Sequence, residues 1–519
     1  MLLKLLNLIN GKIIYANPKK LKRDWEIFKI LTRKALEQAN YNTVFNLLEG
    51  IGWFGYKYNF VDSFKDAEVD NFIIQLTNKI KPEIRQVKVS NHRIAFYDHF
   101  TLENRGFTQQ YLDELMKQDI EILYIMADES KLKDDNKIVN TLRLYPKAKI
   151  IALNASLSRV DQFQNVLIQI VNFGPSKLFI HNAPWDIISC CLCIALKEAK
   201  VSSYLLNITD HAYWPGADIF DYIIDFRSFG HLLNHRIKGI PSERLLIIPT
   251  PAYIRKGEEF EGIDNVQITN KIIGFSGGST YKIVDANNTF LKLIKKVLDQ
   301  NENFVFLFAN VGNSDFIRKF IKENSLEERF ILLGNRRDIN EVFKNIDIYF
   351  NTYPYGGGLM IQYALYNKKP ILALMHPDLS YTHLENVIDR NLGQMYRIDN
   401  EKDYLMIAKK LIQDECFRKS YAEELAKEQN IDVEFQENLK ALLNDSKILD
   451  YPLVEDFSMN STAVTKFHLD YNNYHYNDYL DFRRRYFKDM DIYYKTINIS
   501  IPYFISRVIK RIGNKFGLQ

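Results

Sequence analysis

Residues 350–372 read FNTYPYGGGLMIQYALYNKKPIL. An apolar strand runs into three glycines, Gly356, Gly357 and Gly358, then an apolar helix follows, and a proline precedes a new strand. The first amides of a helix have no partners within the helix, and the helix dipole adds partial positive charge there. Glycines let a ligand approach those amides. The stretch predicts a phosphate or diphosphate site, with a flexible glycine turn as the alternative.

A second group of glycines ends an earlier apolar run. Residues 274–282 read GFSGGSTYK, so Gly277 and Gly278 precede Ser279 and Lys282. Hydroxyls and a lysine beside glycines suit phosphate oxygens. A helix start capped by the serine is the alternative. The residue order differs from both the Walker A loop and the dinucleotide-binding GxGxxG motif.

A third loop, GNRRDINEVFKNID at 334–347, follows another apolar run. Asp338 and Glu341 have the spacing of a capping box at the start of a helix. Asn335 and Arg336 come just before that helix, at the carboxyl end of the predicted strand. We expect them to contact a base or a phosphate, with a solvated arginine as the alternative.

The wider pattern predicts an α/β protein. The chain has 519 residues, too many for one ordinary core. Short apolar strands alternate with helices in two series, which predicts two doubly wound, Rossmann-like domains that face a cleft. We expect a helical N-terminal segment, two Rossmann-like domains and a helical C-terminal extension, at residues 1–85, 86–262, 263–430 and 431–519.

The net charge, the cysteines and the N-terminal apolar run exclude some classes of function. The net charge of +4 is small for 519 residues and gives no reason to expect nucleic acid binding. Cys190, Cys191 and Cys193 lie in one apolar helical stretch, Cys416 stands alone, and neither zinc nor disulfide spacing is present, so buried thiols are expected. The apolar start is too short to span a membrane and lacks a cleavage site, which predicts a cytoplasmic protein.

The order of these loops resembles the donor half of a GT-B glycosyltransferase, and is similar to the O-GlcNAc transferase group and its bacterial relatives. The resemblance covers residues 90–430 as architecture and residues 271–376 at the level of motifs. It implies a donor domain at 263–430 that binds a nucleotide-diphosphate sugar, a UDP-sugar first of all, with no further cofactor. The donor-binding residues are then Gly277, Gly278, Ser279, Lys282, Asn335, Arg336, Tyr355, Gly356, Gly357, Gly358 and Gln362.

Two departures from the GT-B pattern bear on mechanism. Many such enzymes hold the ribose with an acidic residue in the helix after the glycines, but here that position falls at Tyr363, beside Gln362. The paired glutamates of the large retaining group are absent, because Tyr355 and Tyr363 occupy those spacings. This favours an inverting mechanism.

The resemblance makes the first Rossmann-like domain, 86–262, the acceptor domain. In the stretch NITDHAYWPGADIFD at 207–221, a predicted strand ends at Thr209, and Asp210 and His211 follow it. An inverting transfer needs a group that takes the proton of the acceptor. His211 is the first candidate for that role or for a donor contact, with Asp210 to orient it. A histidine that only fixes the loop is the alternative.

Two more loops of this domain supply candidates. FYDHFTLENRGFTQQY at 96–111 offers Asp98 or His99 as the rival base, with Arg105 on the acceptor side. FIHNAPWD at 179–186 offers His181, whereas its Asp186 is expected to cap the following helix.

Other stretches add less. His376 and His383 follow a strand of the donor domain and are candidates for donor-sugar contacts. No metal-ligand set emerges, and the DMD sequence at 489–491 is interpreted as surface charge. Residues 502–516 form a basic amphipathic pattern, which fits either a peripheral membrane contact, with a lipid-linked acceptor, or a helix packed across both domains. The basic run RRRYFK at 483–488 adds charge upstream of it.

The sequence therefore predicts a metal-independent glycosyltransferase of the hexosyl or N-acetylhexosaminyl class. Its acceptor would be a surface glycan intermediate, a lipid-linked glycan or a protein. Two alternatives stay open. One is a nucleotide-sugar epimerase of the same fold, and the other is a non-catalytic GT-B-like subunit of a glycosyltransferase complex.

Overall fold

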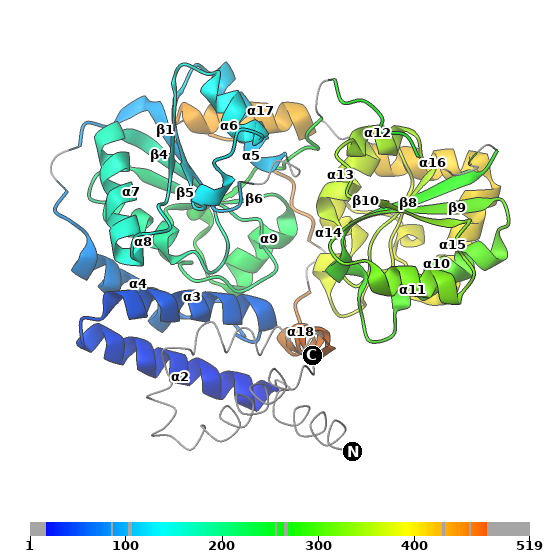
Figure 1. The fold of residues 1–519 in the computed structure, drawn as a ribbon, viewed down its shortest axis with the longest axis horizontal. Coiled ribbons are helices and arrows are strands. Elements are labelled where there is room, and N and C mark those ends of the chain that lie inside the picture. Colours follow the sequence, from blue (N-terminus) through cyan, green and yellow to red (C-terminus); the bar gives the residue numbers. More distant parts are fainter. Residues whose placement is uncertain are drawn as a thin grey trace, which may run out of the picture.

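The computed structural model describes residues 17–84, 87–101, 106–254, 257–263, 268, 270–427, 431–445, 447–455 and 458–474. Two α/β domains stand side by side, and a layer of helices lies against the first (Figure 1). Within the described residues, no helix has both the length and the apolar character needed to cross a membrane. The predicted basic helix at 502–516 and the charged run at 483–488 lie outside the described residues.

Seven parallel strands form the first sheet, in the order β3-β2-β1-β4-β5-β6-β7. The strands are β1 Ser90–Asp98, β2 Glu121–Met126, β3 Ala148–Ala152, β4 Pro175–His181, β5 Ser202–Leu206, β6 Tyr222–Asp225 and β7 Leu245–Ile247. Successive residues of β1 point to opposite faces, so Ala95 and Tyr97 enter one core while Ile94 and Phe96 enter another. A parallel sheet needs such a cover on both faces.

Helices cover both faces of this sheet. They are α5 Phe107–Lys117, α6 Lys137–Arg143, α7 Arg159–Phe173, α8 Ile187–Leu196 and α9 Ser228–Leu232. Local signals set their limits: Ser158 accepts a hydrogen bond from the amide of Asp161 at the start of α7, and Gly174 ends that helix with φ of +66°.

Five parallel strands form the second sheet, in the order β10-β9-β8-β11-β12. They are β8 Ile272–Ser279, β9 Phe304–Val311, β10 Phe330–Gly334, β11 Ile348–Phe350 and β12 Ile371–Leu372. The helices of this domain are α10 Thr289–Gln300, α11 Asp315–Glu323, α12 Ile339–Lys344, α13 Gly358–Tyr366, α14 Leu384–Ile388, α15 Glu401–Gln413 and α16 Glu415–Ala426.

The predicted fold class is confirmed, since both sheets are parallel and doubly wound. In each sheet the strand order reverses beside the first strand, between β1 and β4 and between β8 and β11. Ligands of such sheets bind at the carboxyl ends of the strands, at this reversal. One predicted limit is wrong: β5 ends at Leu206 instead of Thr209, so the loop that carries His211 starts three residues earlier.

Three N-terminal helices form a layer against α7 and α8 (Figure 1). They are α2 Pro18–Glu37, α3 Tyr41–Tyr58 and α4 Ala67–Ile80. Two glycines let α3 approach the first domain closely. A Cβ at Gly52 would lie 2.5 Å from the carbonyl oxygen of Pro184, and one at Gly55 would lie 2.2 Å from the ring of Tyr213. These helices therefore pack directly on the loops that follow β4 and β5.

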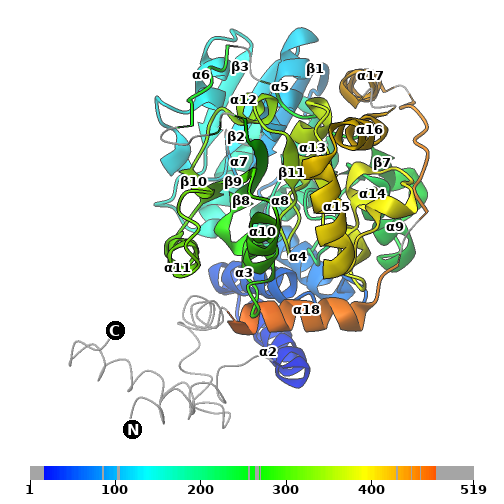
Figure 2. The same ribbon diagram turned by 90° about the vertical axis from the view of Figure 1, so that its right-hand side faces the viewer.

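The C-terminal extension returns to the first domain. Helix α17, Ile431–Leu443, buries Phe435 and Leu439 in the core beside α5. Helix α18, Ser461–Tyr474, then lies near α3, below the junction of the two domains (Figure 1), and it runs across the molecule in the turned view of Figure 2. Cys190, Cys191 and Cys193 are buried free thiols, as expected, whereas the free thiol of Cys416 is exposed.

The close contact of α3 predicts the effect of Gly52→Ala. Because the added methyl group meets a backbone carbonyl, we expect overpacking to cost about 1–3 kcal/mol. That cost exceeds the gain of about 1 kcal/mol that alanine brings to a helix interior. Thermal unfolding followed by circular dichroism should show a lower midpoint. Gly393→Ala is the control, because that position has open space around it. A midpoint unchanged in Gly52→Ala would contradict the packing of α3.

Candidate functional site

The glycine loop after β11 leaves the start of α13 uncapped. Ile361 donates the first intrahelical bond, to the carbonyl of Gly357 (3.0 Å), so the amides of Gly358, Leu359 and Met360 have no acceptor within the helix. Among the described residues, no side chain caps this start. Gly358 is exposed, and a Cβ there would meet only one methyl group, at 3.9 Å. An exposed, uncapped helix start suits an anion.

The other two glycines have a packing role. Asn351 accepts a hydrogen bond from the amide of Gly357 (2.9 Å). A Cβ at Gly356 would come within 2.9 Å of the Asn351 side chain, and one at Gly357 within 3.2 Å of the Tyr349 hydroxyl. A tight turn therefore accounts for Gly356 and Gly357 but gives no reason for Gly358.

The loop after β8 is bonded to the glycine loop. Lys282 Nζ donates to the carbonyl of Gly356 (3.3 Å), and the amide of Tyr355 donates to the carbonyl of Lys282 (3.2 Å). A Cβ at Gly277 would lie 2.7 Å from Met360 Cε, so this glycine lets β8 approach the first turn of α13. The lysine ammonium thus lies beside the uncapped helix start.

Ser279 ends β8 and precedes a short 3-10 helix, Thr280–Ile283. Among the described residues, the Ser279 hydroxyl caps no amide of that helix, so the serine-capped start is not formed. Gly278 has φ of +153°, and a Cβ there would meet Lys282 Cδ at 3.2 Å. Ser279 and Lys282 therefore stay candidates for phosphate contacts.

The third loop differs from expectation. The Arg336 guanidinium binds the Asp338 carboxylate (2.7 and 2.5 Å) and the carbonyl of Gly262 (2.6 Å), and it is largely buried. Asp338 also accepts from the amide of Glu261 (2.8 Å), so it caps no amide of α12 and the predicted capping box is wrong. Arg336 thus anchors the linker, the segment between β7 and β8 that joins the two domains, whereas Asn335 is exposed beside it.

The candidate residues of α13 and of the loop before it contact different parts of the molecule. Tyr363, at the predicted ribose position, donates its hydroxyl to the carbonyl of Tyr253 in the linker (2.9 Å). Gln362 is half-buried on the same helix. The Tyr355 ring packs edge-on against Tyr471 of α18, with the centroids 4.8 Å apart. Sequence reasoning gave α18 no part in the site.

Asp98 is fully buried at the end of β1. Its carboxylate accepts from the hydroxyls of Thr108 and Tyr124 (both 2.8 Å) and from the amide of Thr101 (2.9 Å), and His181 Nδ1 lies at 3.0 Å. Burial opposes ionisation, but the neighbouring His181 and these hydrogen bonds lower the pKa of Asp98 to about 2. Both residues are thus engaged in fixing their loops.

His99 forms a pair with Asp186 at the reversal of the first sheet. His99 Nδ1 lies 2.6 Å from Asp186 Oδ2, which also accepts from the Tyr97 hydroxyl (2.8 Å). Asp186 caps α8 through the amide of Ser189 (3.1 Å), as predicted. Burial lowers the pKa of His99, but the Asp186 charge outweighs it, so the pKa lies above the ordinary 6.5. The imidazole is about a quarter exposed, at 26%.

His211 and Asp210 lie where the two domains meet. His211 Nδ1 is 3.2 Å from Asp210 Oδ1, and its ring stacks on Tyr381 of the second domain, with the centroids 5.0 Å apart. Arg227 binds both oxygens of Asp210 (2.5 and 2.9 Å). Burial disfavours the charge, but Arg227 holds the pKa of Asp210 well below its usual range. The sequence-predicted pair is thus brought together, with an arginine added.

Arg227 is a residue that sequence reasoning missed. It also donates to the carbonyls of Tyr381 (3.3 Å) and Asn386 (3.2 Å), so it joins the loop of His211 to the second domain. Its neighbour Ser228 donates its amide to Asp389 of that domain (2.8 Å). Its position in the sequence could have indicated a role in the site, because Arg227 comes two residues after the carboxyl end of β6.

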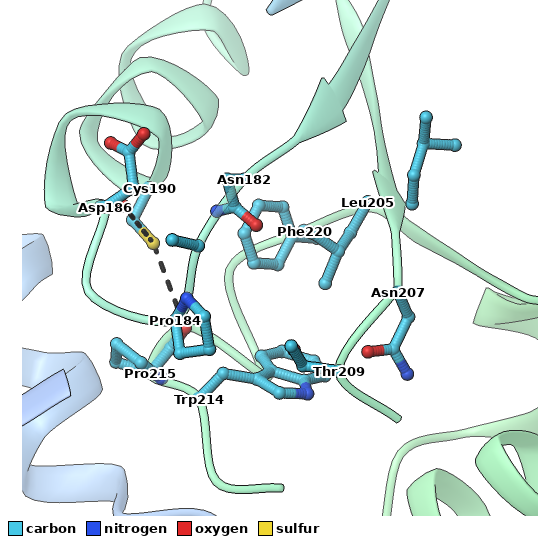
Figure 3. Close-up of a pocket in the computed structure, with 12 residues that line it drawn as sticks. Asn182, Pro184, Asp186, Cys190, Leu205, Asn207, Thr209, Trp214, Pro215 and Phe220 are labelled. Carbon is cyan, nitrogen blue, oxygen red and sulfur yellow. Dashed lines mark hydrogen bonds between the residues drawn. The ribbon is translucent and has the colours of Figure 1, made fainter. Parts of the chain in front are cut away.

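A small recess opens between the ends of β4 and β5, and the space inside it holds about one water molecule. Asn182 and Asn207 follow these two strands, and Trp214 lies across the lower side of the recess in Figure 3. Trp214 Nε1 and Asn207 Oδ1 are buried, and neither has a hydrogen-bond partner among the described residues. The recess therefore offers one donor and one acceptor to a small polar group.

The remaining candidates are less informative. His383 Nε2 lies 3.1 Å from the carbonyl of His376, whose ring packs against Phe467 of α18. Arg105 lies outside the described residues. Within the part of the chain that the structure describes, no group of three or more histidine, cysteine or acidic side chains is arranged to hold a metal ion.

Solved structures share this fold at low sequence identity. A mutant O-GlcNAc transferase from Thermobaculum terrenum has a TM-score of 0.51 at 15% identity, over 88% of this chain and 82% of its own. Anabaena HepE, solved with UDP and glucose, has a TM-score of 0.51 at 12% identity, over 68% of this chain and 99% of its own. A Listeria monocytogenes protein inferred to be a UDP-N-acetylglucosamine 2-epimerase has a TM-score of 0.51 at 9% identity, over 70% and 100%.

These likenesses confirm the predicted resemblance at the level of the fold: the chain has the GT-B fold. No family model and no curated protein matches the sequence.

The buried ion pair predicts the effect of Arg227→Met. The substitution leaves Asp210 buried without its cation, which should lower the free energy of unfolding by about 3–5 kcal/mol at neutral pH. In the wild type the pKa of Asp210 is depressed, so the pair stabilises the fold above the unfolded pKa and the stabilisation is lost as pH falls through the folded one. The difference between variant and wild type should therefore shrink as pH falls below about 4.

Urea unfolding at several pH values tests this prediction. Arg236→Met is the matched control, because its partner Glu455 is exposed and such a pair contributes about 0–1 kcal/mol. Equal losses in the two variants, or a difference independent of pH, would contradict the assigned role of Arg227.

Proposed function

We propose that this chain is a glycosyltransferase that moves a hexosyl or N-acetylhexosaminyl group from a nucleotide-diphosphate sugar, foremost a UDP-sugar, to an acceptor hydroxyl. The observation that carries the proposal is the joined pair of loops at the reversal of the second sheet. There the uncapped amides of Gly358, Leu359 and Met360 lie next to Lys282. HepE, solved with UDP, has the same fold and supports a diphosphate as the anion.

These groups suit the leaving diphosphate. Cleavage of the bond between sugar and phosphate leaves added negative charge on the phosphate oxygens. Fixed amide dipoles and an ammonium group stabilise such charge without reorganisation. A metal ion is then not needed for this step, which keeps the sequence-based expectation of a metal-independent transfer as part of the proposal.

The first domain would receive the acceptor. The recess between β4 and β5 presents the Trp214 N–H and the Asn207 oxygen, which together match a hydroxyl group that both accepts and donates a hydrogen bond. The acceptor itself would be a glycan, a lipid-linked glycan or a protein.

Of His99 and His211, the two partly exposed histidines that the sequence proposed as bases, His99 is the better proton acceptor. The Asp186 carboxylate is ionised and binds His99 directly, whereas the ionised Asp210 carboxylate is paired with Arg227. His211 stacks on the second domain, so we assign it a contact with the donor sugar. With tyrosines at the positions of the retaining glutamates, the proton is taken as the acceptor attacks, and the transfer inverts the anomeric centre.

An epimerase is the second candidate, because the Listeria protein matches the fold equally well. Incubation of the chain with UDP-N-acetylglucosamine, followed by proton NMR, separates the two. An epimerase produces the C2 epimer without any acceptor, whereas a transferase releases UDP by slow hydrolysis of the donor. Affinity for UDP with neither product would favour the non-catalytic subunit.

The uncapped helix start predicts the effect of Gly358→Asp. The position is exposed with room for a side chain, and a carboxylate there favours the helix, so the fold should persist. The added negative charge should repel a diphosphate. In a panel of nucleoside diphosphates, UDP at 100 times its dissociation constant should stabilise the wild type by about 2.7 kcal/mol, measured by thermal shift, and should lose that effect in the variant.

Gly358→Asn is the control, since it has the same size without the charge and should retain most of the shift. If no nucleotide shifts the wild type, or if aspartate and asparagine behave alike, the diphosphate site is in the wrong place.

The role of His99 predicts a pH profile. A general base acts only when deprotonated, so donor turnover should rise as pH increases through the pKa of His99, which lies above 6.5. His99→Gln should lower turnover by about 10²–10⁴-fold, remove this limb of the profile and leave the UDP thermal shift intact. His92→Gln, at the exposed start of β1, is the control. A profile unchanged in His99→Gln would return the role of base to His211.

A further inference from the structure

Asn59 lies at the C-terminal end of α3, and its side chain forms hydrogen bonds with the loop that carries His211. It has left-handed backbone angles (φ 49°, ψ 39°) and is 1% exposed. Its Oδ1 accepts from the amide of Tyr213 (2.8 Å), and its Nδ2 donates to the carbonyl of His211 (3.0 Å). Both ends of one side-chain amide are therefore bound to the backbone on either side of Ala212.

These bonds replace the partners that a strand would have provided. The segment after β5 has left the sheet, so its buried N–H and C=O groups depend on side chains. Asp70 of α4 supplies a further bond, to the amide of Gly216 (2.7 Å). The N-terminal helices thus hold this loop at two points, one next to His211.

Helix α18 is bound to the same asparagine. Thr465 Oγ1 donates to the carbonyl of Asn59 (3.1 Å), and His468 Nε2 lies 3.4 Å from Asn59 Nδ2. Burial lowers the pKa of His468 to about 3, so its imidazole is neutral at neutral pH. A neutral ring nitrogen can accept the second hydrogen of the Asn59 amide.

Neighbouring residues of α18 reach both loops of the donor site. The rings of Phe467 and Tyr471 pack edge-on against Tyr355, with centroids 5.2 and 4.8 Å away, and Tyr355 directly precedes the three glycines. The Tyr471 hydroxyl donates to the carbonyl of Tyr281, in the loop after β8 (2.8 Å). A single helix of the C-terminal extension therefore touches Asn59 and both phosphate-binding loops.

We propose that Asn59 is a positioning residue for His211, and that α18 couples this loop to the donor loops, so that the site is complete only with α18 docked. The inference rests on the proposed function for its kinetic readout. It gives a role to the N-terminal helices and to the C-terminal extension, for which the sequence showed no chemistry.

Asn59→Gly is the decisive variant, because glycine adopts left-handed backbone angles readily and the substitution removes only the side chain. The kcat/KM for hydrolysis of a UDP-sugar, measured by the release of UDP, should fall at least tenfold. The thermal shift with UDP, which lacks the sugar, should stay unchanged. The control is Asn288→Gly, which also has left-handed angles (φ 51°) but makes no side-chain cap bond and lies in the second domain. Unchanged kcat/KM in Asn59→Gly would overturn the positioning role.

A readout independent of activity separates this inference from the proposed function. In protein with isotope-labelled histidine, the ring signals of His211, identified by their loss in His211→Gln, should shift or broaden in Asn59→Gly, while those of His92 stay in place. This result would support the positioning role even if UDP fails to bind and the proposed function falls. Unchanged His211 signals would overturn it, whatever the outcome with UDP.

Phe467→Ala tests the coupling by α18. Loss of the ring beside Tyr355 should reduce the UDP thermal shift, since the glycine loop loses its support. If Phe467→Ala keeps the full UDP thermal shift and the wild-type kcat/KM, the proposed coupling by α18 is overturned.

Discussion

Every strand of both sheets is parallel, and this constraint shapes the candidate site. Parallel strands all end at the same edge, so each passes the chain to a loop whose backbone polar groups have left the ladder. Buried groups of that kind need other partners. Here they are side chains: Asp98, Asp186 and Asn351 bind amides in the loops that follow strands, and Asn59 reaches such a loop from the end of α3.

The same constraint explains what sequence reasoning could and could not predict. Short apolar runs that alternate along the chain with helical patterns identify the strands. The two sheets and the loops after their strands can therefore be predicted from local sequence patterns. Asp186 precedes a helix and caps it, which is again a local signal. Asn59 and His468 are 409 residues apart, and their contact depends on how α3 and α18 meet. No local pattern reports such a contact.

Arg336 and Asp338 show how tertiary contacts override local rules. The spacing of Asp338 and Glu341 fits a capping box, yet the carboxylate binds an arginine two residues away and a linker amide instead. A bidentate pair of guanidinium and carboxylate joins two opposite charges through two hydrogen bonds, whereas a cap bond joins one charge to an amide, so the arginine holds the carboxylate. The predicted capping box was wrong because the prediction considered only the helix start and not the guanidinium of Arg336 beside Asp338.

The contacts between the domains limit how the site can open. Arg227 donates to two carbonyls of the second domain, Ser228 donates to Asp389, and α18 binds both halves. Hydrogen bonds to charged groups contribute about 1.5–3 kcal/mol each, so a rigid separation of the domains breaks several at once. Displacing α18 breaks the contacts of Thr465 and His468 with Asn59, the Tyr471 bond to Tyr281 and a set of ring contacts, and it exposes the buried Val464. The contacts between the domains and those of α18 therefore act together to hold the loops of the candidate site in one arrangement.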